Sequence, residues 1–391
     1  MFSQYGYSTV TAVMPRASSR AVIESVFEYS GASALMWSAR GTLIQDHWRR
    51  RWLPAVSPAR SMIQMLVPDA EVFAVVDSVV RNGKLDQQAT GAVFSSPCEQ
   101  TYLGSRFRAW PASEASSTEV AKVDLNSSLS AIYCIVGHSS SERVTRAAMD
   151  AGAHGPIVYY SEGRGLRDRL GWLRITKEAE KEVLMVIADE ADAEEVFTAM
   201  AKAGRLHLPG RGFMYRMPIS AGLYNLPSRV SHHHYDANMQ QVINAIDHLA
   251  GHSHWRDQAV VDIGGGKGAG IDALLDAGAV LEDQKALTAI VDRDHLQPLM
   301  DLLLSAGAPG LNVNHARFAA PSQDTSEGRV SREYSQVRCV TSAQVAEQIA
   351  AQIEARGEPE GLDDMCLLVQ EVPRVMTYIP GNKNYRRSNA A

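Results

Sequence analysis

Apolar and polar positions recur along this chain in one order that is repeated three times. In each copy, a short apolar run typical of a strand is followed by an amphipathic stretch typical of a helix. A glycine-bearing segment comes next, and a glycine just past a helix suits a left-handed C-cap. The three glycine-bearing segments are residues 30–34, 151–155 and 306–310.

Each copy then continues with a second strand, a long polar loop, a third strand, a second helix and a last strand. The strands are expected at 10–14, 34–38, 62–67 and 91–95; at 131–136, 156–160, 183–187 and 212–218; and at 287–291, 311–318, 336–340 and 365–372. The helices are expected at 18–29, 71–81, 140–150, 193–203, 296–305 and 343–356. This order predicts an α+β chain of three ferredoxin-like β-α-β-β-α-β repeats, each with a four-stranded antiparallel sheet and two helices on one face.

The repeats divide the chain into five parts. We expect repeat 1 at residues 8–97, repeat 2 at 129–223 and repeat 3 at 286–380. Residues 98–128 are rich in serine, proline and polar groups and are predicted to form a linker. Residues 224–285 form an inserted segment with a His-rich and a Gly-rich stretch, and they are too apolar for a passive linker.

Composition narrows the class of protein. The 391 residues are 45% hydrophobic and 21% charged, which allows buried cores and excludes disordered and fibrous chains. A net charge of −6 argues against a general binder of nucleic acid or membrane surfaces. The four cysteines form no CxxC pair, which is typical of a reducing compartment. We find no signal-peptide pattern and no apolar run of ~18 residues, so we expect a cytoplasmic protein.

Residues 131–223 resemble the PII family of signal-transduction proteins. Residues 161–165 (Ser-Glu-Gly-Arg-Gly) lie where the mobile T-loop of that family begins. Residues 204–213 resemble its glycine-bearing B-loop, and repeats 1 and 3 resemble the family in outline. Since PII proteins are trimers, the resemblance implies a trimer fused into one chain, a pseudotrimer.

The B-loop departs from the family pattern at one position. The family usually places a lysine there, which pairs with a nucleotide phosphate. Phe213 takes this position in repeat 2, Ala92 in repeat 1, and Cys366 or a neighbour in repeat 3. The loop still offers backbone N–H groups to an anion, but the resemblance does not carry over a fixed cation.

The densest candidate chemistry lies in the inserted segment. Histidine is a common metal ligand and an acid or base near neutral pH. We therefore assign His232, His233, His234, Tyr235 and Asp236 as candidate catalytic residues. A divalent metal of unknown identity would have His232, His234, His252 and His254 as candidate ligands, and its bound water would be a nucleophile. The alternative interpretation is a solvated polar loop.

Repeat 2 contains the candidate substrate-binding residues. Its basic loop around residues 163–169 is predicted to be a lid for a substrate or effector, by analogy with mobile functional loops. The candidate residues are Arg164, Arg167, Trp172, His207 and Arg211.

Three functions remain open. The first is a hydrolase of a small amide, nitrile or activated aromatic compound, in which histidine or a His-bound metal activates water. The second is a PII-like signalling protein that binds a nucleotide or a small anion. The third is a C-terminal domain that resembles S-adenosylmethionine-dependent methyltransferases at residues 260–268, where Asp292 or Asp294 would hold the ribose.

The partners follow from the same observations. We expect a small-molecule substrate or effector, no nucleic acid and no membrane, and nothing in the sequence indicates nicotinamide or flavin. The chain is compatible with a homo-oligomer, with a partner subunit, or with a self-sufficient pseudotrimer.

Overall fold

The computed structural model describes most of the chain but not all of it. The described residues are 2–4, 6–27, 32–41, 59–87, 90–104, 107, 125–165, 180–226, 280–319, 332–356, 362 and 364–378. The His-rich and Gly-rich stretches of the inserted segment lie outside these ranges.

The main strands and helices fall into three successive groups with the same order of elements. Unit 1 consists of β2 (Tyr7–Pro15), α1 (Ser19–Phe27), β3 (Ser33–Gly41), β4 (Ala59–Pro68), α2 (Val72–Gly83) and β5 (Gly91–Pro97). Unit 2 consists of β7 (Leu129–Val136), α3 (His138–Asp150), β8 (His154–Gly165), β9 (Glu180–Asp189), α4 (Ala193–Gly204) and β10 (Gly212–Ile219). Unit 3 consists of β12 (Val280–Asp292), α8 (Leu296–Ser305), β13 (Gly310–Ala319), β14 (Arg332–Ser342), α9 (Ala343–Arg356) and β15 (Cys366–Thr377).

Strand pairing within each unit is antiparallel and follows one pattern. The first strand lies between the third and the fourth, and the second strand pairs with the third. The strands are strongly apolar, as in β7, where all eight residues are buried. Burial on both faces is expected where one face packs on helices and the other on neighbouring units.

Pairing between units joins the sheets. The second strands pair in a ring, β3 with β8, β8 with β13, and β13 with β3. Short strands β6 (Gln100–Leu103) and β11 (Ala221–Asn225) follow the last strands of units 1 and 2, and each pairs with the last strand of another unit. The end of β15 likewise pairs with β10 of unit 2, and β1 (Phe2–Gln4) pairs with β6. These pairings use backbone groups that would otherwise lie at open sheet edges.

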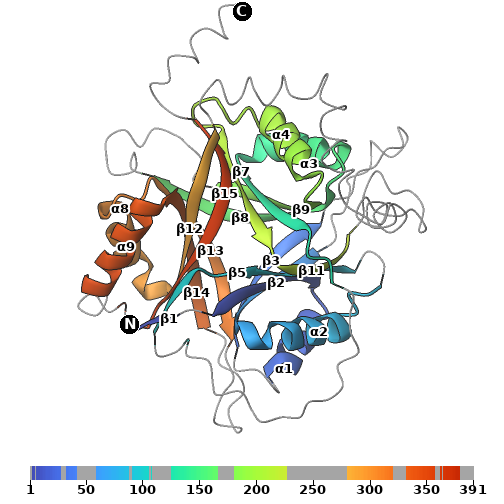
Figure 1. Cartoon of the computed structure of the whole chain (residues 1–391), viewed down its shortest axis with the longest axis horizontal. Coiled ribbons are helices and arrows are strands. Elements are labelled where there is room, and N and C mark those ends of the chain that lie inside the picture. The colour runs from blue at the N-terminus through green and yellow to red at the C-terminus, as the bar shows by residue number, and fades with distance from the viewer. Residues whose placement is uncertain are drawn as a thin grey trace, which may run out of the picture.

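The helices lie in three pairs around the outside of the strands (Figure 1). One apolar cluster per unit fills the space between its sheet and its helix pair. A fourth cluster, between the inner faces of the sheets, takes residues from all three units. Each helix buries one side against its sheet, which explains the amphipathic pattern in the sequence.

Buried polar side chains also connect the units. The Nη1 atom of Arg338 on β14 donates a hydrogen bond to the Tyr215 hydroxyl on β10 at 2.9 Å. Gln370 on β15 donates to the Thr9 hydroxyl on β2 at 3.1 Å. Gln336 of unit 3 donates to Gln64 of unit 1.

Three predicted boundaries differ from the structure. Residues 161–165, predicted as the start of a loop, are the end of β8, because β13 of the next unit supplies hydrogen-bond partners there. Residues 100–103 of the predicted linker form β6. Strand β12 begins at Val280, inside the predicted insertion, because its first residues pair with the end of β15.

Candidate functional site

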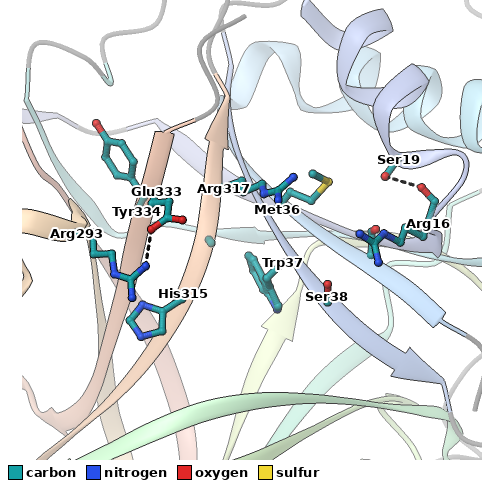
Figure 2. A pocket seen from close by; sticks show the side chains of 12 residues that line it. Arg16, Ser19, Met36, Trp37, Ser38, Arg293, His315, Arg317, Glu333 and Tyr334 are labelled. Carbon is teal, nitrogen blue, oxygen red and sulfur yellow. Dashed lines mark hydrogen bonds and ion pairs between the residues drawn. The ribbon is translucent and has the colours of Figure 1, made fainter.

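A pocket of about 330 Å³ lies between unit 1 and unit 3 (Figure 2). Its volume is at the lower end of the range for small-molecule sites. Unit 1 contributes residues of β3 and β4 and the turn before α1, and unit 3 contributes β13, the start of β14 and the turn after β12. The lining residues are Arg16, Ser19, Met36, Trp37, Ser38, Ser61, Arg293, His315, Ala316, Arg317, Glu333 and Tyr334.

Three arginines give the pocket its charge. Arg16 follows β2 directly, and the Ser19 hydroxyl donates to its carbonyl oxygen at 2.8 Å, which supports the turn into α1. Arg293 occupies the corresponding turn after β12, and Arg317 is on β13. Among the residues that the structure describes, the lining has one carboxylate, Glu333, which pairs with Arg293. The three arginines and Glu333 give the described lining an excess of two positive charges, apart from His315, in a chain whose net charge is −6.

Trp37 provides a buried donor in the lining. Its side chain is 7% exposed, and its Nε1 atom has no hydrogen-bond partner among the described residues. The indole ring packs edge-on against Tyr159 of unit 2, with centroids 5.9 Å apart. A buried N–H without a partner is costly, so it is a group that a ligand oxygen would satisfy.

His315 connects this pocket to unit 2. Its Nδ1 atom lies 3.1 Å from the Ser335 hydroxyl, and its Nε2 atom lies 3.4 Å from Oε1 of Glu162. Partial burial acts to raise the pKa of Glu162, but hydrogen bonds from Arg164 and His315 outweigh it. The pKa of Glu162 is therefore below its ordinary value, and the group is a carboxylate at neutral pH.

The sequence-predicted residues of unit 2 lie elsewhere. Arg164 is on β8 and pairs with Glu162 at 3.0 Å. His207 and Arg211 lie in the turn between α4 and β10. Burial, with a smaller effect from Arg205, lowers the pKa of His207, and its Nδ1 atom has no partner within the described ranges. None of these three residues lines the pocket.

The remaining predicted residues lie outside the described residues. They are Arg167, Trp172, His232, His233, His234, Tyr235, Asp236, His252 and His254. Their assignment as catalytic, metal-binding or substrate-binding residues therefore stays a prediction. In the part of the chain that the structure describes, no group of three His, Cys, Asp or Glu side chains is placed to hold a metal ion.

The three positions aligned with the B-loop lysine are structurally equivalent. Each is the first or second residue of the last strand of its unit, and Ala92, Phe213 and Cys366 pair with Val13, Ile135 and Ile290 of the first strands. Ala92 and Cys366 are fully buried in the central cluster, and Phe213 packs against it. Apolar residues at these positions thus fill the space between the units.

The neighbouring glycines have a packing role. A Cβ atom at Gly212, where φ is +128°, would lie 2.0 Å from the carbonyl oxygen of Ile135. A Cβ atom at Gly91 would lie 1.9 Å from the carbonyl oxygen of Val13. Close approach of the first and last strands therefore accounts for both glycines.

Of the residues that resemble a methyltransferase site, the structure describes Asp292 and Asp294 but not residues 260–268. Asp292 ends β12, and its Oδ1 atom accepts a hydrogen bond from the backbone N–H of Asp294 at 3.1 Å. Strand β12 pairs antiparallel with β14 and β15. The glycines at 264–266 lie outside the described residues, so the ribose-binding role stays a prediction.

Comparison with known proteins gives only weak structural likenesses. No family model and no curated protein matches this chain. The chain is similar to a PII protein of Arabidopsis thaliana bound to citrate, with 21% identity over 24% of this chain and 80% of that one and a TM-score of 0.19. It is also similar to an anthrone oxidase-like protein, with 10% identity over 57% of this chain and 97% of that one and a TM-score of 0.16. No helix among the described residues is sufficiently long and apolar to cross a membrane.

The sequence contains one signal that would have located the pocket. Arg16 and Arg293 occupy the same place in repeats 1 and 3, just after the first strand. A cation at the same place in two repeats marks the start of both helices as a candidate anion site. That the two units place these arginines at one pocket depends on how their second strands pair.

Proposed function

We propose that this protein binds a small anionic molecule in the pocket between unit 1 and unit 3, as an effector or a substrate. The observation that carries the proposal is the convergence of Arg16, Arg293 and Arg317 on a lining whose described residues include a single carboxylate. Arginine binds carboxylates and phosphates through charge-assisted hydrogen bonds. The Trp37 indole N–H adds a buried donor of matching polarity.

The fold supports this proposal in one respect. We propose that the three units are ferredoxin-like repeats, because each has the element order and the strand pairing expected of that fold. Fusion of three units allows their junctions to differ in sequence, so one junction can bind a ligand while the others hold the units together. The hydrolase hypothesis stays a prediction, since its histidines lie outside the described residues.

Calorimetric titration tests the proposal. Wild-type protein is titrated with inorganic phosphate, AMP, ADP, ATP and succinate, at low and high salt. We expect saturable binding of at least one anion, weakened by salt because the arginines are exposed. Loss of one charge-assisted hydrogen bond costs about 1.5–3 kcal/mol, so Arg317→Gln should weaken binding about tenfold or more.

A matched control separates the pocket from general charge. Arg146 on α3 is also exposed and lies outside the pocket, where it pairs with Glu142. Arg146→Gln makes the same change in net charge and should leave affinity unchanged. Absence of binding by every anion, or an equal effect of the two variants, would refute the proposed function.

A further inference from the structure

The three junctions between second strands have the same register. We call each junction a corner and name it after the unit whose second strand begins there. The facing residues are Arg40 and Val158 at the unit 2 corner, Glu162 and Val313 at the unit 3 corner, and Arg317 and Met36 at the unit 1 corner. Because the register is the same at all three corners, Arg40, Glu162 and Arg317 occupy equivalent positions.

Two more equivalent positions lie at each corner, both in the unit after which the corner is named. The first is the third-strand residue that lies opposite the second-strand residue two positions before Arg40, Glu162 or Arg317. Ser61 pairs with Met14 and Ser38, Glu182 with Val136 and Tyr160, and Ser335 with Val291 and His315. The second is the residue two positions beyond that first-strand partner, which is Arg16, His138 or Arg293.

The unit 2 corner contains its own carboxylate. The Glu182 side chain is 1% exposed, and its Oε1 atom accepts hydrogen bonds from Nη2 of Arg40 at 2.6 Å and from Nδ1 of His138 at 2.8 Å. Arg40 also lies over the Tyr160 ring, 5.5 Å from its centroid. The buried carboxylate thus accepts hydrogen bonds from two units, from Arg40 of unit 1 and His138 of unit 2.

The unit 3 corner also contains a carboxylate, at a different position. Glu162 stands where the unit 2 corner has Arg40, and it faces His315 at 3.4 Å. Its second oxygen accepts from Arg164 at 3.0 Å. Two corners therefore have a carboxylate at one of the three equivalent positions.

The unit 1 corner has arginines at two of these positions and a serine in place of the Glu182 carboxylate, while Glu333, the carboxylate of the described lining, pairs with Arg293. Arg317 and Arg16 stand at the positions of Arg40 and His138, and Ser61 stands at the position of Glu182. All three line the pocket. Neither arginine forms an ion pair with another residue within the described ranges. Serine is shorter than glutamate by a methylene group and the carboxylate, so both space and charge are left for another anion.

We infer that the pocket binds a small molecule through a carboxylate, which takes the place between Arg16 and Arg317 that Glu182 takes between Arg40 and His138. The inference rests on the proposed function and adds the chemical class of the ligand. A planar carboxylate is favoured over a tetrahedral phosphate because a carboxylate is the group that the equivalent corner accommodates.

Two substitutions give each corner the residue of the other at the position of Ser61 and Glu182. Ser61→Glu supplies the missing carboxylate from the chain, whereas Ser61→Gln has the same shape without the charge. Glu182→Ser removes the carboxylate from the unit 2 corner. The probes are succinate and inorganic phosphate, titrated calorimetrically at one pH and ionic strength, together with the melting temperature of each unliganded variant.

We expect wild-type protein to bind succinate at one site per chain and phosphate at least tenfold more weakly. Ser61→Glu should lower succinate affinity at least tenfold and raise the melting temperature above that of Ser61→Gln. Glu182→Ser should bind a second succinate per chain. The Glu182→Ser variant tests the inference independently if Ser61→Glu does not fold.

The results distinguish the two proposals. If wild-type protein binds phosphate or a nucleotide but not succinate, the proposed function stands and the carboxylate inference is wrong. Succinate binding that Ser61→Glu leaves unchanged, or a Glu182→Ser variant with a single site, would also overturn the inference. If no anion binds, the proposed function itself fails.

Discussion

The hydrogen bond between Tyr215 and Arg338 provides a direct test of how the units hold together. It joins β10 of unit 2 to β14 of unit 3 inside the central cluster, at 2.9 Å. Tyr215 is 1% exposed and Arg338 8% exposed. Tyr215→Phe removes the hydroxyl and leaves the ring, which stacks on Tyr133 with centroids 5.1 Å apart. The substitution therefore deletes one interaction and little volume.

The expected cost follows from the charge on the donor. A hydrogen bond to a charged group contributes about 1.5–3 kcal/mol, more than one between neutral groups. Arg338 keeps its Nε bond to the Thr288 hydroxyl at 3.0 Å and its position over the Tyr133 ring, 5.3 Å from the centroid. Because these contacts remain, the guanidinium is only partly unsatisfied, and we expect a loss of about 2 kcal/mol.

Urea unfolding followed by circular dichroism measures this loss as a change in the free energy of unfolding. Tyr160→Phe is the matched control, since it removes a hydroxyl that lies 3.4 Å from Nη1 of Arg40 on a side chain that is 57% exposed. The control should change stability by less than about 0.5 kcal/mol. If Tyr215→Phe costs no more than the control, buried polar bonds between units do not stabilise this assembly.

Two further predictions concern strand packing and pH. Gly91→Ala should destabilise the protein by about 1–3 kcal/mol or prevent folding, because its Cβ atom would clash with the Val13 carbonyl oxygen, whereas Gly137→Ala, with no heavy atom within 4 Å, should change stability by less than about 1 kcal/mol. Equal melting temperatures for the two variants would contradict the close approach. Burial raises the pKa of Cys98, Cys339 and Tyr133 to about 12, so the unfolded chain loses these protons first as pH rises. Stability should be unaffected below the ordinary pKa values of 9.0 and 10.0 and then fall towards pH 12, by about 1.4 kcal/mol per pH unit for each ionised group, and unchanged urea unfolding between pH 8 and 11 would refute this.

The helices and strands could be predicted from the sequence, because each depends on residues that are close along the chain. The alternation of apolar runs with amphipathic stretches predicted six strand–helix junctions, and the structure has α1, α3 and α8 after the first strands and α2, α4 and α9 after the third. The glycines at 152 and 307 have positive φ, as expected just past a helix. The ends of strands and the short strand β6 were harder to predict, because β6 and the end of β8 pair with strands of another unit.

From the sequence by itself, the order of strands and helices and the presence of buried apolar cores could be predicted, because both follow from local pattern and composition. Only the tertiary structure decided where charges meet. Arg16 and Arg317 are about three hundred residues apart, and they line one pocket because β13 pairs with β3 in a single register. Likewise, Glu182 accepts hydrogen bonds from two units, from Arg40 and His138, although nothing near it in the sequence indicates this. Short-range patterns specify helices and strands, whereas a site at the junction of units depends on contacts between segments far apart along the chain.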